Sequence, residues 1–413
     1  MIQPITIGRA TIYHADCLVA LAQLPENSID AVVTDPPYGL AFMGKGWDAP
    51  ENIAFHPEVW RQVLRVLKPG GHLLAFGGTR TYHRLVCAIE DAGFEVRDQI
   101  GWAFGTGFPK SHDVALAIDK AARGVPHGGV DPTSVNHGKY RTQRTEGARS
   151  DNDLGRGYGA GPGQYMAEAG GKNERDYVPE AAAWAGWGTA LKPAWEPICV
   201  ARKPLVGTVA ENVRQHGVGA LNIAGCRVPT DSGRPLREAR RNEQSDEDRN
   251  AYHKGLAGSK AVGDTDLGRW PANIIHDGSD EVEQAFAQFG QSQSRIGKPR
   301  GSATPGDGWG MTKTGAEYDD TGSPSRFFYA AKASKAERQG SKHPTVKPIA
   351  LMRYLCRLVT PPGGTVLDPF AGTGTTAQAA AIENFNAILI EQEAQYIKDI
   401  QARLANQAGP LFS

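Results

Sequence analysis

The sequence predicts an α/β fold, in which a mostly parallel, Rossmann-like sheet has helices on both faces. Two stretches of alternating strand and helix patterns, residues 11–104 and 348–404, lead to this prediction. Each contains a strand–helix–strand unit, and such a unit places its two strands parallel in one sheet. A third apolar run, Trp195–Lys203, predicts a strand that returns to the same sheet.

The N-terminal stretch begins with a strand over Thr11–Asp16 and a helix over Cys17–Leu24, whose leucines have helical spacing. The apolar run Ala31–Thr34 predicts the next strand, so Asp16 and Asp35 both follow strand ends. The further elements expected here are a helix from Pro57 that the glycines after Lys68-Pro69 stop, a strand over His72–Phe76, a helix capped by Thr79 that runs to Ala92, and a strand over 94–104.

The C-terminal stretch has the same alternation. Its expected elements are a helix over Ile349–Val359, a strand over Thr365–Asp368, a tight turn over Pro369–Gly374, a helix over Thr375–Ile382, a strand over Ala387–Glu391 and a helix over Ala394–Leu404. The carboxyl ends of parallel strands are where open α/β sheets bind ligands. We therefore expect the residues after these strands to form a site with those after the N-terminal strands.

Between the two stretches the pattern weakens. Residues 105–190 read as an insertion with one short helix, Ser111–Ala122, and otherwise much Gly, Arg, Asn and Asp. Residues 204–335 have too little regular pattern to belong to the central sheet and are expected to form a smaller second region. The sheet domain is then divided between residues 1–104 with 191–203 and residues 340–413.

Composition sets broad bounds. The 413 residues are 40% hydrophobic and have a net charge of zero, and the N-terminus lacks a signal-peptide pattern. The five cysteines include no C-x-x-C pair, so buried reduced thiols in a cytoplasmic protein are expected, with no metal site. Two locally basic stretches supply candidates for contact with phosphates: Arg141, Arg144, Arg237, Arg240 and Arg241.

The first motif is Asp35-Pro36-Pro37-Tyr38, at the end of the strand Ala31–Thr34. A carboxylate, two prolines and an aromatic ring at a strand end suit the binding of a flat ring that bears an amine. A strand that runs into a rigid turn explains the same four residues equally well. The tetrapeptide alone does not decide between the two interpretations.

The second motif is the turn Asp368-Pro369-Phe370-Ala371-Gly372-Thr373-Gly374, between a strand and a helix. Its glycines let the backbone approach a ligand, and Glu391 at the next strand end is placed to accept hydrogen bonds from ribose hydroxyls. The turn therefore indicates a cofactor that contains adenosine, either a dinucleotide or S-adenosylmethionine. A purely structural glycine turn is the alternative.

The third motif, His343-Pro344-Thr345-Val346-Lys347-Pro348, precedes the helix Ile349–Val359. Lys347 is placed to meet a carboxylate, although a solvated lysine at a helix start is the simpler interpretation. A cofactor with a carboxylate fits S-adenosylmethionine better than a nicotinamide dinucleotide.

In this order, the three motifs resemble the β-group DNA amino-methyltransferases, which methylate adenine N6 or cytosine N4 with S-adenosylmethionine. The resemblance covers residues 11–104 and 343–404, and Gly107–Ser111 and Trp187–Pro193 resemble the phage and prophage site-specific type. It implies a catalytic half at residues 1–104 with 191–203, a cofactor-binding half at 340–413, and target recognition by parts of 105–190 and 204–335. It also implies double-stranded DNA as the partner and allows a homodimer.

The resemblance also implies individual roles. Asp35 and the Pro36 carbonyl would accept hydrogen bonds from the target amine, Pro37 would fix the turn, and Tyr38 would stack on the extruded base. The residues implied to bind the cofactor are Asp16, Lys347, Asp368, Phe370, Gly372, Thr373, Gly374 and Glu391. Asp16, which would contact the adenine, is equally explained as a carboxylate at a helix N-terminus. Trp184 and Trp187 are candidate stackers, although core packing is the expectation for them.

Asp rather than Ser at position 35 favours adenine as the target base, while cytosine N4 is the nearest alternative. Three other classes stay open: an oxidoreductase that uses the glycine turn, a DNA-binding protein without catalysis, and an amino-methyltransferase that acts on protein or RNA.

Overall fold

The computed structural model describes residues 2–40, 48–49, 51–105, 107, 111–125, 177–230, 268–293, 321–331 and 347–407. The chain divides into two compact units. The larger unit combines residues 1–105 with 195–413, and the smaller one comprises residues 106–194. Among the described residues, no helix is both long enough and apolar enough to cross a bilayer.

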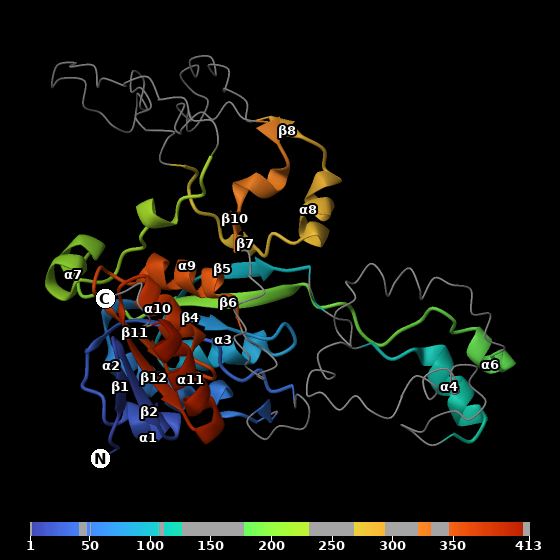
Figure 1. Cartoon of the computed structure of the whole chain (residues 1–413), viewed down its shortest axis with the longest axis horizontal. Helices are drawn as coiled ribbons and strands as arrows, with labels where there is room; N and C mark the ends of the chain where they lie inside the picture. The colour runs from blue at the N-terminus through green and yellow to red at the C-terminus, as the bar shows by residue number, and fades with distance from the viewer. Residues whose placement is uncertain are drawn as a thin grey trace, which may run out of the picture. The chain divides into compact units, whose positions relative to one another are not determined.

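The larger unit is built on one sheet (Figure 1). Within the described residues this sheet has ten strands, in the spatial order β1 (Ile5–Ile7), β2 (Ala10–His14), β12 (Asn386–Glu391), β11 (Thr365–Asp368), β3 (Ile29–Thr34), β4 (Leu67–Phe76), β6 (Trp195–Arg202), β5 (Glu95–Ala103), β7 (Ile274–His276) and β10 (Tyr329–Ala330). The strands β8 (Ser292–Gln293) and β9 (Thr321–Gly322) form a separate pair.

Parallel pairing dominates the sheet. It joins β2, β12, β11, β3 and β4 in sequence, and it also joins β5 to β7 and β7 to β10. The strand β6 is antiparallel to both of its neighbours, and β1 is antiparallel to β2. The predicted α/β fold with a mostly parallel, Rossmann-like sheet is confirmed. Its central pairing sets Val366 of β11 beside Ala31 of β3, although 335 residues separate them.

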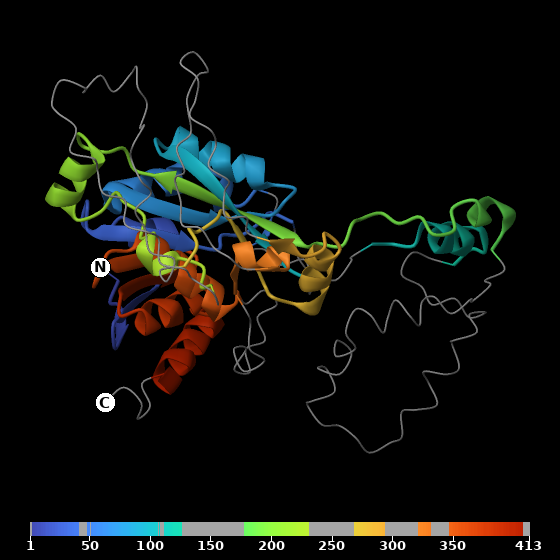
Figure 2. The ribbon, with the colours of Figure 1, turned by 90° about the horizontal axis from the view of Figure 1, so that it is seen from above.

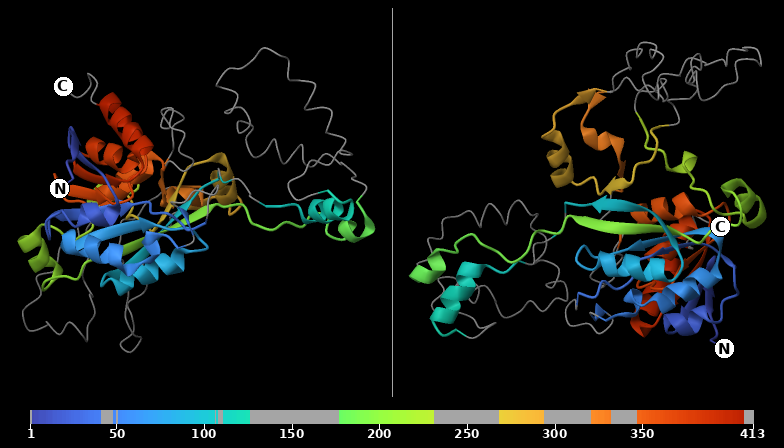
Figure 3. Two further views of the ribbon diagram at one scale, coloured as in Figure 1. Left: turned by 90° about the horizontal axis from the view of Figure 1, so that it is seen from below. Right: turned by 180° about the vertical axis from the view of Figure 1, so that it is seen from behind.

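Helices cover both faces of the sheet. On one face lie α1 (Cys17–Leu21), α2 (Pro57–Val66) and α3 (Tyr82–Asp91), and on the other lie α9 (Ile349–Val359), α10 (Thr375–Ile382) and α11 (Ala394–Gln407). Figures 2 and 3 show the blue and the red helices on opposite sides of the strands. The further helices are α4 (Val114–Ala122), α6 (Pro179–Ala182), α7 (Val209–His216), α8 (Asp280–Ala287), and the short 3₁₀ turns Ile53–Phe55, Ala224–Cys226 and Pro324–Phe327.

The two faces explain the apolar run at the heart of β3. Successive side chains of a strand point to opposite faces, so Val32 packs on the α1–α3 side while Val33 packs on the α9–α11 side. Leu73 and Leu74 of β4 divide in the same way. A strand that is buried on both faces exposes none of its side chains to water. Its sequence is therefore a continuous apolar run.

The predicted elements match the observed ones closely in both regular stretches. The helices α9 and α10 and the strand β11 have the predicted bounds. The helix α3 begins later than expected, because Thr81 rather than Thr79 occupies its N-cap position. The Thr81 hydroxyl donates to the Tyr38 carbonyl at 2.7 Å, so it does not cap the helix.

The prediction that residues 204–335 stay outside the central sheet is wrong for two strands. Ile274 and Ile275 of β7 pair with Gly101 and Trp102 of β5, and β10 extends the same edge. These strands have three and two residues, too few for a periodic pattern to mark them in the sequence. The edge of the sheet thus includes residues that we had expected to form a separate region.

In the smaller unit, α4 begins at Val114 with Asp113 as its N-cap, three residues after the predicted start. The two segments that resemble the phage type meet here, because the Thr189 amide donates to the Ser111 hydroxyl at 2.9 Å. Trp184 and Trp187 lie edge to face with their ring centroids 5.2 Å apart. They are 43% and 61% exposed, so the expected core packing is wrong for both.

Four of the five cysteines are buried, as expected of reduced thiols, but Cys87 on α3 is exposed. Burial raises the pKa of the Cys17 and Cys199 thiols to about 12.

Trp60 provides a test of the core on the α1–α3 side. Its side chain is fully buried, and its indole N–H donates to the Ala54 carbonyl at 2.8 Å. We expect Trp60→Ala to lower the free energy of unfolding by about 3–5 kcal/mol, because it leaves a cavity and an unpaired carbonyl. Urea denaturation measures the change. Phe289→Ala, at a ring that is 79% exposed, is the control and should change stability by less than about 0.5 kcal/mol. Equal losses for both variants would contradict the described core.

Candidate functional site

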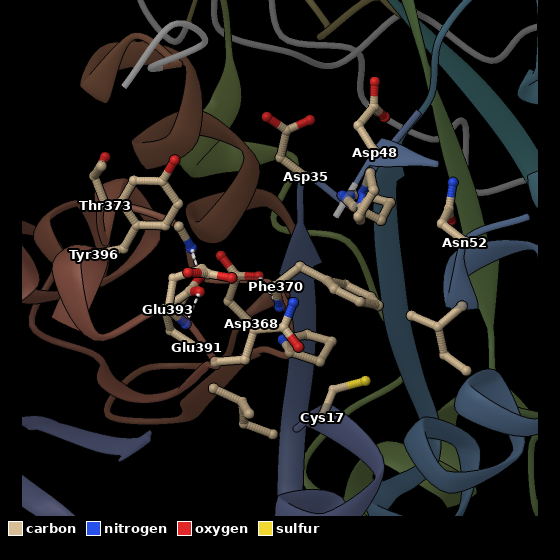
Figure 4. A pocket seen from close by; sticks show the side chains of 18 of the residues that line it. Cys17, Asp35, Asp48, Asn52, Asp368, Phe370, Thr373, Glu391, Glu393 and Tyr396 are labelled. Atoms are coloured by element: carbon tan, nitrogen blue, oxygen red, sulfur yellow. Dashed lines mark hydrogen bonds between the residues drawn. The ribbon is translucent and has the colours of Figure 1, made fainter. Parts of the chain in front are cut away.

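A pocket of about 390 Å³ opens at the carboxyl edge of the sheet. Most of its lining comes from the loop after β3, the turn after β11, the end of β12 and the start of α1 (Figure 4). Lys347, Met352 of α9 and Tyr396 of α11 add to it. The adjacency of β3 and β11 brings the first two together. All of the predicted site residues except Gly374 line this pocket, namely Asp16, Asp35, Pro36, Pro37, Tyr38, Lys347, Asp368, Phe370, Gly372, Thr373 and Glu391.

Asp368 joins the two halves of the site. One of its carboxylate oxygens accepts a hydrogen bond from the Thr34 hydroxyl at 2.6 Å, and the other accepts from the Thr376 hydroxyl. Thr34 is the last residue of β3, so this bond ties β3 directly to the turn after β11. Burial raises the Asp368 pKa to about 6, while its hydrogen bonds oppose the shift.

Glu391 shapes the glycine turn from the end of β12. Its carboxylate accepts from the backbone N–H of Gly372 at 2.8 Å and from that of Glu393 at 2.7 Å. Gly372 has a φ of +50°, a conformation that glycine adopts without strain. Burial raises the Glu391 pKa to about 7, again against the effect of its backbone hydrogen bonds. Figure 4 shows Glu391 and Asp368 on the same side of the pocket.

Gly374 contributes to the turn from outside the pocket. It is the N-cap residue of α10 and has a φ of +79°. A Cβ atom at this position would lie 2.9 Å from Ile400 of α11. Both observations require glycine for reasons of backbone conformation and packing, so its expected contact with a cofactor stays a prediction.

A cluster of charged groups surrounds Asp35. Lys347 Nζ donates to Asp35 Oδ2 at 2.7 Å, and the Tyr38 hydroxyl donates to Asp35 Oδ1 at 2.8 Å. The same ammonium lies 3.2 Å from Glu196 Oε2. Glu196 is the second residue of β6. Burial alone would favour neutral lysine, but Asp35 and Glu196 together raise the Lys347 pKa. Burial and the neighbouring carboxylates raise the Tyr38 pKa well above its usual value.

The ammonium of Lys347 contacts two carboxylates of the chain itself, which the sequence did not predict. Its predicted contact with the carboxylate of a cofactor stays a prediction. His343 to Val346, the rest of that motif, lie outside the described residues.

Two further predicted residues have local roles as well. The Asp16 carboxylate caps α1, accepting from the backbone N–H of Leu18 at 2.9 Å and of Val19 at 3.3 Å. Asp16 thus acts as the carboxylate at a helix N-terminus, the second of its two interpretations from the sequence. Its side chain also borders the pocket. The Phe370 ring packs at a tilt against Trp60, with centroids 6.2 Å apart, and presents an apolar surface to the pocket.

Sequence reasoning missed two residues that organise the loop after β3. Glu196 stands within a short apolar strand, and no motif marks it. Asp48 is buried and accepts from the backbone N–H of Gly39 at 2.7 Å and of Leu40 at 3.2 Å, which fixes the chain just after Tyr38. Only a structure reveals such pairings, because the partners are backbone atoms or lie far away in the sequence.

The arginines predicted to contact phosphates, Arg141, Arg144, Arg237, Arg240 and Arg241, lie outside the described residues. Within the described ranges, no group of three or more His, Cys, Asp or Glu side chains is arranged to hold a metal ion.

Comparison with known proteins identifies a family model, described as a DNA methylase of the N6/N4 type, that matches residues 29–153 and 163–402. The type II methyltransferase M.HindIII of Haemophilus influenzae is 25% identical over 252 residues, 51% of this chain and 64% of that protein. The type II methyltransferase M.HpaI of Haemophilus parainfluenzae is 31% identical over 120 residues, 26% of this chain and 37% of that protein. The chain thus spans less than two thirds of the length of both relatives.

Among solved structures, the complex of M1.HpyAVI with SAM is similar at 15% identity, over 95% of this chain and 99% of that chain, with a TM-score of 0.38.

The raised pKa of Glu391 predicts a pH-dependent stability. The folded carboxyl binds its proton up to about pH 7, whereas the unfolded one loses it near 4.5, so the folded state should lose stability as the pH rises between these values. We expect the wild-type unfolding free energy to fall relative to that of Glu391→Gln by about 3 kcal/mol at most over this window. Urea denaturation at a series of pH values measures this difference, and parallel curves would contradict it.

Proposed function

We propose, since the chain belongs to the N6/N4 DNA methylase family, that it transfers a methyl group from S-adenosylmethionine to the exocyclic amine of a base in double-stranded DNA. We further propose that the base is adenine and the acceptor its N6. The observation that supports the activity most directly is that Asp35, at the end of β3, shares one pocket with Glu391 and the glycine turn. An acceptor for an amine and a site for an adenosine cofactor thus lie together.

The residues present fit the cofactor. Glu391 supplies carboxylate oxygens suited to ribose hydroxyls, and Phe370 supplies an apolar surface suited to a flat base. The cavity volume, about 390 Å³, is in the range of small-molecule sites. We infer that these two residues, with the Gly372 backbone, hold the adenosine moiety, and that Asp16 approaches it from α1.

The charge of the pocket favours a cation over a dinucleotide. Among the described residues that line it, seven are acidic and one is basic: Asp16, Asp35, Asp48, Glu51, Asp368, Glu391 and Glu393 against Lys347. The two phosphates of a dinucleotide would meet this negative field unfavourably, whereas a sulfonium centre is stabilised by it. This argues against the oxidoreductase alternative.

When bound, the cofactor supplies an electrophilic methyl group on a positively charged sulfur. The chain's own contribution is to prepare the nucleophile. An exocyclic amine is a weak nucleophile, because its lone pair is delocalised into the ring. Asp35 and the Pro36 carbonyl can accept hydrogen bonds from its two N–H groups. These bonds favour a pyramidal nitrogen with a directed lone pair. Pro37 has no N–H that would compete for these acceptors.

Inside a duplex the amine is hydrogen-bonded and cannot be reached in line, so the target base must leave the stack. Tyr38 is the ring next to Asp35, and we assign it the role of stacking on the extruded base. That role requires its hydroxyl to leave Asp35, to which it is bonded at 2.8 Å in this structure. Target recognition is assigned to parts of 105–190 and 204–335, where the exposed rings of Trp184 and Trp187 can stack on bases.

Digestion of methylated DNA to nucleosides tests the activity and the base together. The chain is incubated with S-adenosylmethionine and bacterial genomic DNA, because the recognition sequence is not specified by any residue above, and the nucleosides are separated by mass. We expect N6-methyladenine. N4-methylcytosine would overturn the assignment of adenine alone. Methylation of RNA or protein with none of DNA would overturn the proposed substrate.

Asp35→Asn tests the catalytic assignment. We expect the rate of methyl transfer at saturating substrates to fall at least about 100-fold, because the amine loses a charged acceptor. The dissociation constant for S-adenosylmethionine, measured by calorimetry, should change less than about threefold, since the adenosine-binding groups stay in place. The control is Asp91→Asn, at an exposed carboxylate that ends α3. Full activity of Asp35→Asn would contradict the role of Asp35.

A further inference from the structure

Asp35 shares its hydrogen-bond partners with a second carboxylate. Lys347 Nζ lies 2.7 Å from Asp35 and 3.2 Å from Glu196, and the Tyr38 hydroxyl lies 2.8 Å from Asp35 and 3.4 Å from Glu196. Glu196 belongs to β6, whereas Asp35 follows β3, so the two carboxylates approach one ammonium from different strands. Only 7% of the Lys347 side chain is exposed.

Both oxygens of the carboxylate that the proposed reaction needs are engaged in this arrangement. Each oxygen of Asp35 accepts one hydrogen bond, one from Lys347 and the other from Tyr38, and keeps a second lone pair. A target amine that donates to Asp35 shares its oxygens with these donors, and its hydrogen bond strengthens when one of them withdraws. A buried ammonium that loses its carboxylate without gaining another is strongly destabilised.

Glu196 supplies that second carboxylate. The Lys347 ammonium is already within 3.2 Å of it, so a shift of a few tenths of an ångström exchanges the stronger contact from Asp35 to Glu196. No change of strand position is needed, because β6 is held on one side by β4 and on the other by β5.

We propose that Glu196 is a positioning residue for methyl transfer, which takes over Lys347 when the target amine binds to Asp35. The inference rests on the proposed function and deepens it. In the proposed reaction the C–S bond of the donor would break as the C–N bond forms, so positive charge would develop on the amine nitrogen until it loses a proton to water. An ammonium held on Asp35 would oppose this charge, and one drawn towards Glu196 opposes it less.

The protonation state of Glu196 fits this role. The groups that face it are Asp35 and Tyr38 from the loop after β3 and Lys347 from the segment before α9. Burial raises its pKa, Lys347 lowers it, and Asp35 raises it, with a net rise. Protonation of Glu196 would return Lys347 to Asp35. The rate should therefore fall as the pH drops and Glu196 takes up its proton.

Glu196→Gln is the test, made on the full chain with S-adenosylmethionine and genomic DNA. We expect the rate at saturating substrates to fall about 10- to 100-fold, with the dissociation constant for the cofactor changed less than about threefold. The wild-type rate should fall with falling pH as Glu196 takes up its proton, and the variant should lack this component while Asp368 and Glu391, whose pKa values are also raised, still titrate in it. Glu95→Gln is the matched control. This variant removes a 2.6 Å ion pair between Glu95 of β5 and Arg202 of β6. Glu95 lies outside the Asp35 cluster, so the rate of the variant should equal that of the wild type.

A double-mutant cycle separates positioning from a structural effect. In a Lys347→Met background there is no ammonium to hold, so Glu196→Gln should lower the residual rate by less than about twofold. An equal loss in both backgrounds would overturn the inference, as would a wild-type rate for Glu196→Gln alone. A wild type that methylates no DNA would overturn the proposed function and this inference together, whereas an active wild type with an unaffected Glu196→Gln variant would overturn only the inference.

Discussion

The pairing of β3 with β11 is the constraint on which the rest of the site depends. The two strands come from opposite ends of the chain, and their parallel register sets Leu367 beside Val32. Parallel neighbours end at the same edge of a sheet, so the residues that follow them must meet there. The hydrogen bond from the Thr34 hydroxyl to the Asp368 carboxylate, with 2.6 Å between the two oxygens, then links the two strand ends. Residues from both halves line the pocket.

This bond shows how a carboxylate can serve structure within a candidate active site. Asp368 is buried, and all of its described donors are hydroxyls or a backbone N–H rather than cations. Burial therefore dominates its pKa, whereas the pKa of Lys347 follows its two neighbouring carboxylates despite burial. Neutral donors hold the turn at Asp368, whereas the cation Lys347 contacts the carboxylates of the cluster around Asp35. Structural support of the turn and the charged cluster around Asp35 thus depend on separate residues.

Much of the sheet could be predicted from the sequence, since β3, β11 and β12 end at residues that motifs mark. The predicted site residues are also brought together, except for Gly374, because the carboxyl edge of a parallel sheet leaves little choice of position. The short strands β7 and β10 could not be predicted, because two or three residues carry no measurable period. The partners of Lys347 were missed for another reason. A lysine shows its charge in the sequence, but which carboxylate receives it depends on strands that only the fold brings together.

The acidic lining of the pocket also bears on how a reaction cycle would end. A sulfonium cofactor enters with a positive charge, and the thioether that remains after methyl transfer has none. In the proposed reaction, the acidic lining as a whole favours the cation and gains nothing from the neutral product. The mutual repulsion of the carboxylates would rise again when the cation is lost, and Lys347 is the one basic side chain among the described residues of the lining. The same field that would favour binding of the donor would therefore also favour release of the neutral product.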